Sequence, residues 1–336
     1  MEKVTMEVVA RAAGVSRSLV SLAYRQQPGV SEATRQHILA VGERLHYTPN
    51  QMASRLAGRG GNTLGVFLQD LHNDLFADIY DGLREIADVE RKHLVLAVGT
   101  IDGQRDWTSV AALLQSRVDV IIAAGLQMPD AEVVRLADRV PIVSVARMIP
   151  GVDSVTSDNA YGARIATEHL LQLDHRNIVF LANPPTDGYL DRRRGYIEAM
   201  RSAGLKPRIA ETSYAREMAA VDAGALLDGG NSPSAIFAHN DQSALGVLDA
   251  LAVRNLTAGR DVSVVGYDNT SASRSPGTDL TTVDIHSRSL GRNAALMALR
   301  RLDEPDRPCE AHTSGPTLVI RSTTGRYFST RVTSKE

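Results

Sequence analysis

Residues 4–25 read VTMEVVARAAGVSRSLVSLAYR, and this stretch decides the fold of the N-terminal part of the chain. Met6, Val9, Ala10 and Ala13 recur at i, i+3, i+4 and i+7, the spacing that predicts one apolar face of a short helix. Gly14 follows them, and glycine takes the positive φ of a helix end without steric cost. We therefore expect the first helix to end at Gly14.

A second short helix is predicted directly after Ser16, whose hydroxyl can accept an unpaired N–H of the first turn. The side chains expected to face the first helix are Val15, Leu19, Val20 and Ala23, and those expected to face outward are Arg17, Ser18, Ser21 and Leu22. Two helices joined in this way indicate a helix-turn-helix, whose second helix lies in the major groove of DNA. An ordinary helical hairpin with a solvated polar face is the alternative on this window alone.

A third helix is expected over residues 32–45, with Ser31 as its cap and with Ile38, Val41 and Leu45 on its inner face. Three short helices with these apolar stripes make one small core. Such a core has marginal stability without a metal or disulfide, which suits a module that is stabilised by binding.

A fourth helix is expected over residues 51–58, after the cap Asn50, and it is too short to persist alone in water. It is either a frayed linker or a hinge helix that orders on DNA and inserts Leu56 into the minor groove. A glycine-rich joint over residues 58–62 follows it.

Charge is distributed unevenly along the 336 residues. Residues 1–60 contain eight Lys or Arg and four Glu, a net charge of +4, whereas the whole chain carries −2. A basic head on an acidic body is typical of a small DNA-contacting module joined to another domain. Cys309 is the single cysteine, so no disulfide forms within the chain, and no apolar run reaches membrane-spanning length. With no apolar signal segment at the N-terminus, we expect a cytoplasmic protein.

From Thr63 onward, short apolar runs alternate with helical patterns. The runs are TLGVFL, HLVLAVG, VDVIIAAG, PIVSVA, NIVFLA, SAIFAHND and DVSVVGYD. The helical patterns cover residues 74–91, 107–116, 130–138, 161–173, 191–203, 218–227, 243–253 and 287–302. This alternation predicts parallel sheets with buried strands and helices on both faces. There are too many elements for one unit, so we expect two similar lobes, with the chain crossing between them near residue 158.

Ligands of open α/β sheets bind beyond the carboxyl ends of the strands. Those ends carry amides, carboxylates and arginine, groups that can bracket adjacent hydroxyls, with aromatic rings near them in sequence. Any one of them has a structural alternative, and Asp241 is as well explained as a cap of the helix that follows it. Their common placement nevertheless predicts a ligand cleft between the lobes.

The chain resembles the lactose/galactose repressor family of bacterial transcription regulators over about residues 4–324. The head carries VARAAGVS, VSEATR, YTPN and the A-x-x-L of the short helix, and the body carries LTTV, HNDQSALG and DVSVVGYDNT. The resemblance implies a homodimer that binds a pseudo-palindromic operator, a paired hinge helix, and a small-molecule effector between the lobes. The implied effector is a sugar, a sugar phosphate or a nucleobase-like molecule.

The resemblance also implies site residues. Thr5, Ser16, Ser21, Ser31, Tyr47 and Asn50 match positions that contact the DNA backbone, Arg17 and Ser18 match the base-reading pair, and Arg25, Ala53 and Leu56 complete the DNA-binding set. Phe76, Ala146, Arg192, Asn240 and Asp268 match effector-binding positions of the family, and a place at or near strand ends adds His72, Tyr214 and Asp241 to the expected effector-binding residues. No catalytic residue, cofactor or metal site is expected.

Several positions depart from the family pattern. Leu19 and Leu22 replace the usual Thr and Arg, Asp74 replaces a Pro, and Asp174 replaces the Gly before His175. Ala146 stands where an effector-binding Asp is often found, so a free hexose is not the obvious effector. A larger, phosphorylated or less polar ligand is equally consistent with the sequence.

The expected fold class is α plus α/β: a helix-turn-helix head, a hinge helix and a two-lobed effector domain like the periplasmic binding proteins. The boundaries are 1–48 for the head, 49–62 for the hinge, 63–330 for the body and 331–336 for a polar tail. Lobe 1 takes 63–157 and 285–312, and lobe 2 takes 158–284 and 313–330. The tail has no leucine heptads, so we expect the assembly to stop at a dimer.

Two other classes of function compete with an operator-binding regulator. A solute-binding protein for sugar import has the same body, but the basic head and the missing export signal argue against it. An enzyme is disfavoured because the sequence has no P-loop, no G-x-G-x-x-G after a strand, no H-E-x-x-H and no Cys/His metal spacing. His72 and Asp74 are better explained as a polar pair at the mouth of the cleft than as metal ligands.

Overall fold

The computed structural model describes residues 4–24, 27–47, 63–184 and 188–328. The chain divides into two compact units, residues 1–60 and residues 61–336. Arg25, Asn50, Ala53 and Leu56, and with them the expected hinge helix, lie outside the described residues.

The described residues of the first unit, 4–24 and 27–47, form three helices: α1 (Met6–Ala13), α2 (Arg17–Tyr24) and α3 (Glu32–Arg44). Gly14 ends α1 at φ 67°. The hydroxyl of Ser16 accepts the N–H of Leu19 at 3.2 Å, and that of Ser31 accepts the N–H of Thr34 at 3.2 Å. The core consists of Val9, Ala10, Ala13, Val20, Ala23, Ile38 and Val41. The structure therefore confirms the predicted helix-turn-helix and its caps.

Arg35 fixes the end of α2. Its guanidinium donates hydrogen bonds to the carbonyls of Leu22, Ala23 and Gln27 at 3.3, 2.9 and 2.9 Å. The last carbonyls of a helix have no partner within it, and a cation is favourable there because of the helix dipole. The arginine of the VSEATR motif thus positions the helix that is expected to enter the groove.

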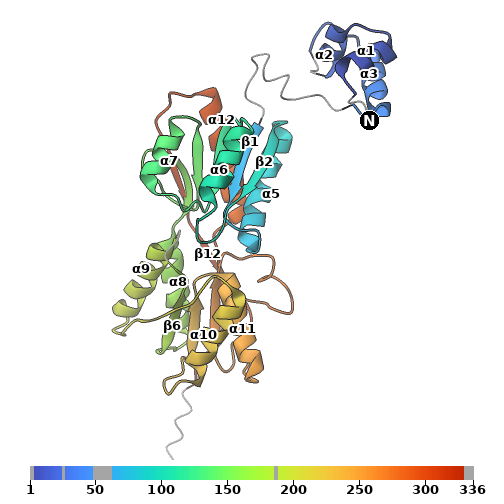
Figure 1. Ribbon diagram of the computed structural model, residues 1–336. Helices are drawn as coiled ribbons and strands as arrows, with labels where there is room; N and C mark the ends of the chain where they lie inside the picture. The colour runs from blue at the N-terminus through green and yellow to red at the C-terminus, as the bar shows by residue number, and fades with distance from the viewer. Residues whose placement is uncertain (1–3, 25–26, 48–62, 185–187, 329–336) are drawn as a thin grey trace, which may run out of the picture. The chain divides into compact units, whose positions relative to one another are not determined.

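The second unit consists of two lobes, each a mainly parallel sheet with helices on both faces (Figure 1). In lobe 1 the strand order is β11-β5-β4-β3-β1-β2. Its strands are β1 (Thr63–Leu68), β2 (His93–Val98), β3 (Val120–Ala124), β4 (Ile142–Val145), β5 (Asp153–Ser157) and β11 (Ala311–Ser314). Its helices are α5 (Asp74–Val89), α6 (Asp106–Gln115), α7 (Asp130–Ala137) and α12 (Ser287–Asp303).

Lobe 2 repeats this topology with the order β12-β10-β9-β8-β6-β7. Its strands are β6 (Ile178–Ala182), β7 (Arg208–Glu211), β8 (Ala235–Ala238), β9 (Ser263–Tyr267), β10 (Thr281–Asp284) and β12 (Thr317–Val319). Its helices are α8 (Asn159–Gln172), α9 (Tyr189–Ser202), α10 (Arg216–Asp228) and α11 (Asp241–Val253). Two layers of helices thus enclose each sheet, as the β-α alternation predicts.

The structure differs from the expected strands in three respects. Strand β2 lies at the edge of its sheet and is partly exposed along its whole length, so it is not a buried strand. Strand β12 pairs antiparallel with β10, although the other pairs are parallel. Strand β11 belongs to the sheet of lobe 1, so the last crossing follows Ser314, two residues beyond the expected boundary.

Close helix packing requires glycine at the α5–α12 contact. A Cβ at Gly82 would overlap the carbonyl oxygen of Arg288, and one at Gly291 would overlap that of Ile79. These two glycines let the backbones of α5 and α12 approach each other on one face of the lobe 1 sheet. Among the helices that the structure describes, none is long and apolar enough to cross a membrane.

Candidate functional site

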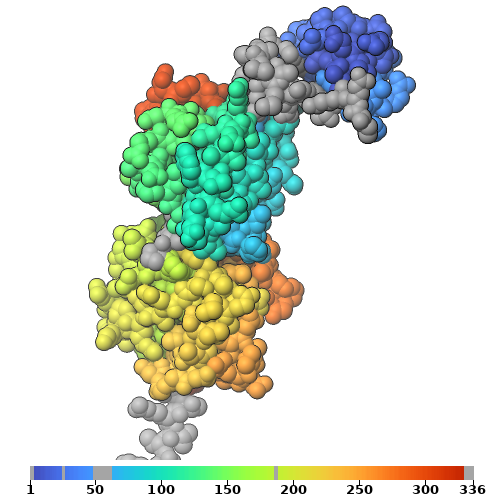
Figure 2. Space-filling view, in the orientation of Figure 1, coloured from blue at the N-terminus to red at the C-terminus, as the bar shows by residue number. Residues whose placement is uncertain are grey.

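A cavity of about 380 Å³ lies between the two lobes. Residues that follow the carboxyl ends of strands in both lobes line it, as expected for open α/β sheets. In Figure 2 the surfaces of the lobes meet along a transverse boundary, blue-green above and yellow and orange below. A cavity of this size is sufficient for a small ligand, since ligand pockets measure roughly 300–1,000 Å³.

Seven of the eight expected effector residues line this cavity: His72, Phe76, Ala146, Arg192, Tyr214, Asn240 and Asp268. They come from both lobes and are separated by as many as 196 positions in the chain. The cavity therefore gathers the residues that the strand ends and the family resemblance singled out. The eighth residue, Asp241, lies elsewhere.

A buried guanidinium–carboxylate pair dominates the lobe 2 side. Arg192 lies 3.4 Å from Asp268, and the two side chains are 8% and 1% exposed. Arg192 also donates to the side chain of Asn159 at 2.8 Å and to the carbonyl of His239 at 2.7 Å. Its guanidinium lies over the ring of Tyr267, 3.7 Å from the ring centre. Four partners thus hold Arg192 in one orientation at the cavity wall.

Asp268 is held in an uncommon state. Burial raises the pKa of this carboxyl to about 8, although Arg192 opposes the rise. Its backbone φ is 109°, in a region that residues other than glycine rarely adopt. Backbone strain of this kind persists where the surrounding structure imposes it, and it is often found at binding sites. Asp268 therefore has both the placement and the chemistry of a ligand contact.

Asp241 is the one expected effector residue that lies outside the cavity, and its contacts there are structural. It is 1% exposed and does not line the cavity. Its carboxylate accepts the N–H and hydroxyl of Thr270 at 2.7 and 3.0 Å and the hydroxyl of Thr282 at 2.6 Å. It does not cap its helix either, because the side chain of Asn240 accepts the N–H of Ser243 at 2.9 Å. Asp241 joins β10 to the loop after β9, behind the cavity.

His72 pairs with Asp70 rather than with Asp74. The ring Nδ1 of His72 lies 2.8 Å from Asp70, and the His72 side chain is 93% exposed at the mouth of the cavity. Asp74 makes different contacts, across the lobe boundary. No three His, Cys, Asp or Glu side chains in the described part of the chain are grouped as a metal ion would require.

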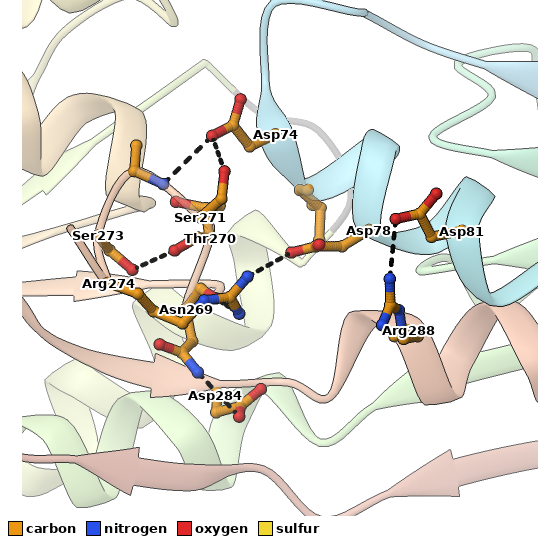
Figure 3. Close-up of polar contacts among 12 residues, drawn as sticks. Asp74, Asp78, Asp81, Asn269, Thr270, Ser271, Ser273, Arg274, Asp284 and Arg288 are labelled. Atoms are coloured by element: carbon orange, nitrogen blue, oxygen red, sulfur yellow. Dashed lines mark hydrogen bonds and ion pairs between the residues drawn. The ribbon is translucent and has the colours of Figure 1, made fainter.

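The lobe boundary is bridged outside the cavity by two acidic side chains of α5. Figure 3 shows Asp74 and Asp78 directed toward residues 269–274, the loop after β9. Asp74 accepts the hydroxyl of Ser271 at 2.6 Å and the N–H of Ala272 at 3.3 Å. Asp78 lies 3.7 Å from Arg274. The carboxylate that replaces the usual Pro at position 74 therefore contributes a contact between lobes.

Sequence reasoning missed a second group of lining residues. These residues are Gln69, Asp70, Ile101, Gly125, Ser157, Asn159, Ala215, Arg216, Glu217, Gln242, Ile285 and Leu290. Ile285 and Leu290 follow β10, a short strand without a long apolar run, so their strand-end position was not visible. Ser157 and Asn159 lie at the end of β5, a polar strand that is not among the predicted apolar runs.

The expected DNA-binding residues that the structure describes lie mostly on the surface of the head. Thr5, Ser16, Arg17, Ser18 and Ser31 are exposed, and Ser21 and Tyr47 are half-buried. Leu22 is also half-buried rather than facing fully outward. Tyr47 packs edge-on against Tyr24, with ring centres 5.4 Å apart. Arg17 and Ser18 lie in the first turn of α2, and their exposed side chains are accessible to a binding partner.

These features define a class of protein: a periplasmic-binding-protein-like body joined to a helix-turn-helix head. Residues 5–50 match the model of bacterial regulatory proteins of the lacI family, and residues 167–324 match that of periplasmic binding protein-like domains. A relative, the HTH-type transcriptional regulator DegA of Bacillus subtilis, is 30% identical over 96% of this chain and 98% of its own length.

Solved structures agree with this class. The lac repressor dimer bound to operator and the anti-inducer ONPF superimposes with a TM-score of 0.82 and 28% identity, covering 96% of this chain and 99% of that one. The transcriptional regulator CelR in complex with cellobiose gives a TM-score of 0.71 and 25% identity, covering 95% and 99%. The chain belongs to the LacI/GalR family.

The protein is accordingly a DNA-binding transcriptional regulator, and not an enzyme. Its body is a domain that binds a sugar-like effector. A solute-binding protein would account for the match over residues 167–324 but not for that over residues 5–50. The presence of the head thus decides between the two classes that share this body.

Proposed function

We propose that this regulator binds a pseudo-palindromic operator as a homodimer, probing DNA with α2 of each head under the control of a small molecule in the lobe cavity. The observation that carries the proposal is the pairing of an exposed Arg17 on a capped α2 with a body whose cavity holds the Arg192–Asp268 pair. The relatives whose structures contain operator DNA or cellobiose support it. The protein would then act in the cytoplasm, where its operator lies.

Within the head, base reading and backbone contact fall to different residues. Arg17 can donate two hydrogen bonds to O6 and N7 of a guanine, which discriminates against other bases by roughly 1–3 kcal/mol. Thr5 makes no capping hydrogen bond, so its hydroxyl is available to a phosphate at the start of α1. Leu56 and Ala53 of the hinge are proposed to meet their partner copies in the minor groove.

Selection of operators from a random DNA pool tests this proposal. The selected sites should contain two inverted half-sites, because a twofold dimer imposes its symmetry on the DNA. Arg17→Ala should relax the preference at one base pair of each half-site. Arg11→Ala, which removes an equally exposed charge from α1, should reduce the salt dependence of binding without changing the preferred sequence. Selection of no common sequence by the intact protein would contradict the proposal.

A further inference from the structure

Helix α3 of the head ends in a Schellman motif, which turns the chain back after the helix. The N–H of Tyr47 donates to the carbonyl of Gly42 at 2.9 Å, and the N–H of His46 donates to that of Glu43 at 2.9 Å. His46 has the left-handed φ of 51° that this motif requires, although it is not a glycine. The motif fixes the backbone that carries Tyr47, the last described residue of the head.

This motif lacks its usual side-chain contact. The residue that follows the left-handed position of a Schellman motif commonly packs against an apolar side chain in the last turns of the helix. Here the matching helix position is Gly42, which has no side chain. A Cβ at Gly42 would overlap the hydroxyl oxygen of Tyr24. The glycine therefore leaves the space that Tyr24 occupies.

Tyr24, the last residue of α2, supplies the missing contact from another helix. Its ring packs edge-on against the ring of Tyr47, with ring centres 5.4 Å apart and ring planes at 77°. This is a favourable arrangement for two aromatic side chains. Both rings also pack against the small core of the head. A side chain of the helix that is expected to enter the major groove thus holds Tyr47 in place.

The hydroxyl of Tyr47 is suited to a phosphate contact. Within residues 4–24 and 27–47, neither of the two tyrosine hydroxyls has a hydrogen-bond partner. Burial raises the pKa of Tyr47, and the opposing effect of Arg17 is smaller. The phenol is therefore protonated at neutral pH. A protonated phenol can donate a hydrogen bond to a phosphate oxygen of DNA.

We infer that Tyr24 is a positioning residue for DNA binding, whose ring holds Tyr47 so that the Tyr47 hydroxyl meets a phosphate of the operator. The inference rests on the proposed function, because it takes the head as the operator-binding module. Backbone contacts orient a DNA-binding module and carry no base preference. Loss of the Tyr24 ring should therefore weaken operator binding and leave the preferred sequence unchanged.

A scan with neutral phosphate analogues tests the inference on the full-length protein. One methylphosphonate at a time replaces a phosphate in one half-site of an operator that the parent protein has selected, and the dissociation constant is measured. At the phosphate that Tyr47 contacts, the replacement should weaken the parent about tenfold, through loss of a hydrogen bond to a charged group, and should not weaken Tyr47→Phe. Tyr24→Leu should also lose the response at this phosphate, although its Tyr47 is intact.

Three further variants separate positioning from stability. Tyr24→Phe keeps the ring and its edge contact, so it should retain the response at this phosphate. Val9→Ala is the control for stability, because Val9 is fully buried in the same core but lies on α1. It should lower the melting temperature and retain the response. Gly42→Ala should act like Tyr24→Leu, because the added methyl group displaces the ring of Tyr24.

Three results would overturn the inference. One is a scan in which Tyr47→Phe responds like the parent at every phosphate, and another is a full response in Tyr24→Leu. The third is a loss of response in Val9→Ala as large as that in Tyr24→Leu. Failure of the proposed function is a different result, because the parent protein would then select no common operator from random DNA.

Discussion

Replacing Asp74 and Asp78 together by asparagine should loosen the contact between the two lobes. Both carboxylates lie on α5 of lobe 1 and contact the 269–274 loop of lobe 2 (Figure 3). Burial raises the pKa of Asp78, so removing this charge should not itself destabilise lobe 1. The variant therefore tests the bridge rather than the fold.

The expected magnitude follows from the geometry of each contact. Asp74 accepts one short hydrogen bond at 2.6 Å and one longer bond at 3.3 Å, in a partly exposed position. The Asp78–Arg274 pair is separated by 3.7 Å, and the arginine is 47% exposed, so solvent screens most of the attraction. Together the contacts should contribute about 1.5 kcal/mol, which corresponds to a roughly tenfold shift of the lobes toward open forms.

Electron spin resonance distances between the lobes measure this shift. One spin label goes on Cys309, which is exposed in lobe 1, and the other on Gly230→Cys, an exposed position of lobe 2 where a side chain meets open space. The double variant should populate longer distances than the parent. Asp81→Asn is the matched control, because Asp81 bonds to Arg288 within lobe 1 at 2.8 Å. Unchanged distances in the double variant, or an equal change in the control, would refute the reasoning.

Three further predictions concern the body. Because the folded pKa of Asp268 is raised to about 8, the contribution of Asp268 to the free energy of unfolding is fully present below the ordinary value of 3.8 and falls by up to about 1.4 kcal/mol per pH unit until about pH 8. Urea unfolding of the parent and of Asp268→Asn at several pH values should show this fall in the difference between the two proteins. Asp241→Ala should lower the free energy of unfolding by about 3 kcal/mol in the same assay, because three buried donors lose their acceptor. An unchanged unfolding midpoint together with weaker effector binding would instead indicate that Asp241 belongs to the effector site. Gly82→Ala should lower the free energy of unfolding by about 1–3 kcal/mol, and with it the melting temperature, because the added methyl group overlaps α12. Gly277→Ala is the control, because Gly277 has open space around it, and it should change the melting temperature little.

The head was predictable because its signals are local. A positive φ at Gly14, hydroxyl caps at Ser16 and Ser31, and apolar residues at helical spacing act within a few residues of one another. The same holds for the buried strands rich in Val and Ile, since continuous apolar runs are characteristic of parallel sheets covered on both faces. Fold class and family could therefore be inferred from the chain alone.

Polar strands were not predictable in this way. Strand β5, DSVTS, is buried, but its Asp153 is paired with Arg301 at 2.9 Å, a partner 148 residues away. Asp174 occupies a position with a φ of 67° where glycine would be unstrained, and it bonds to Arg326 at 2.9 Å. Such residues depend on distant partners, and nothing near them in the sequence indicates those partners.

The sequence by itself determined the helix-turn-helix, the alternation of strands and helices, and the set of strand-end residues, because short-range sterics and hydrophobic spacing specify them. Only the tertiary structure decided the roles within that set. It placed Arg192 against Asp268 at the cavity wall, and it placed Asp241 behind that wall with Thr270 and Thr282. Neighbouring polar residues of similar type received different functions because burial and hydrogen-bond partners come from segments that meet only when the sheet forms.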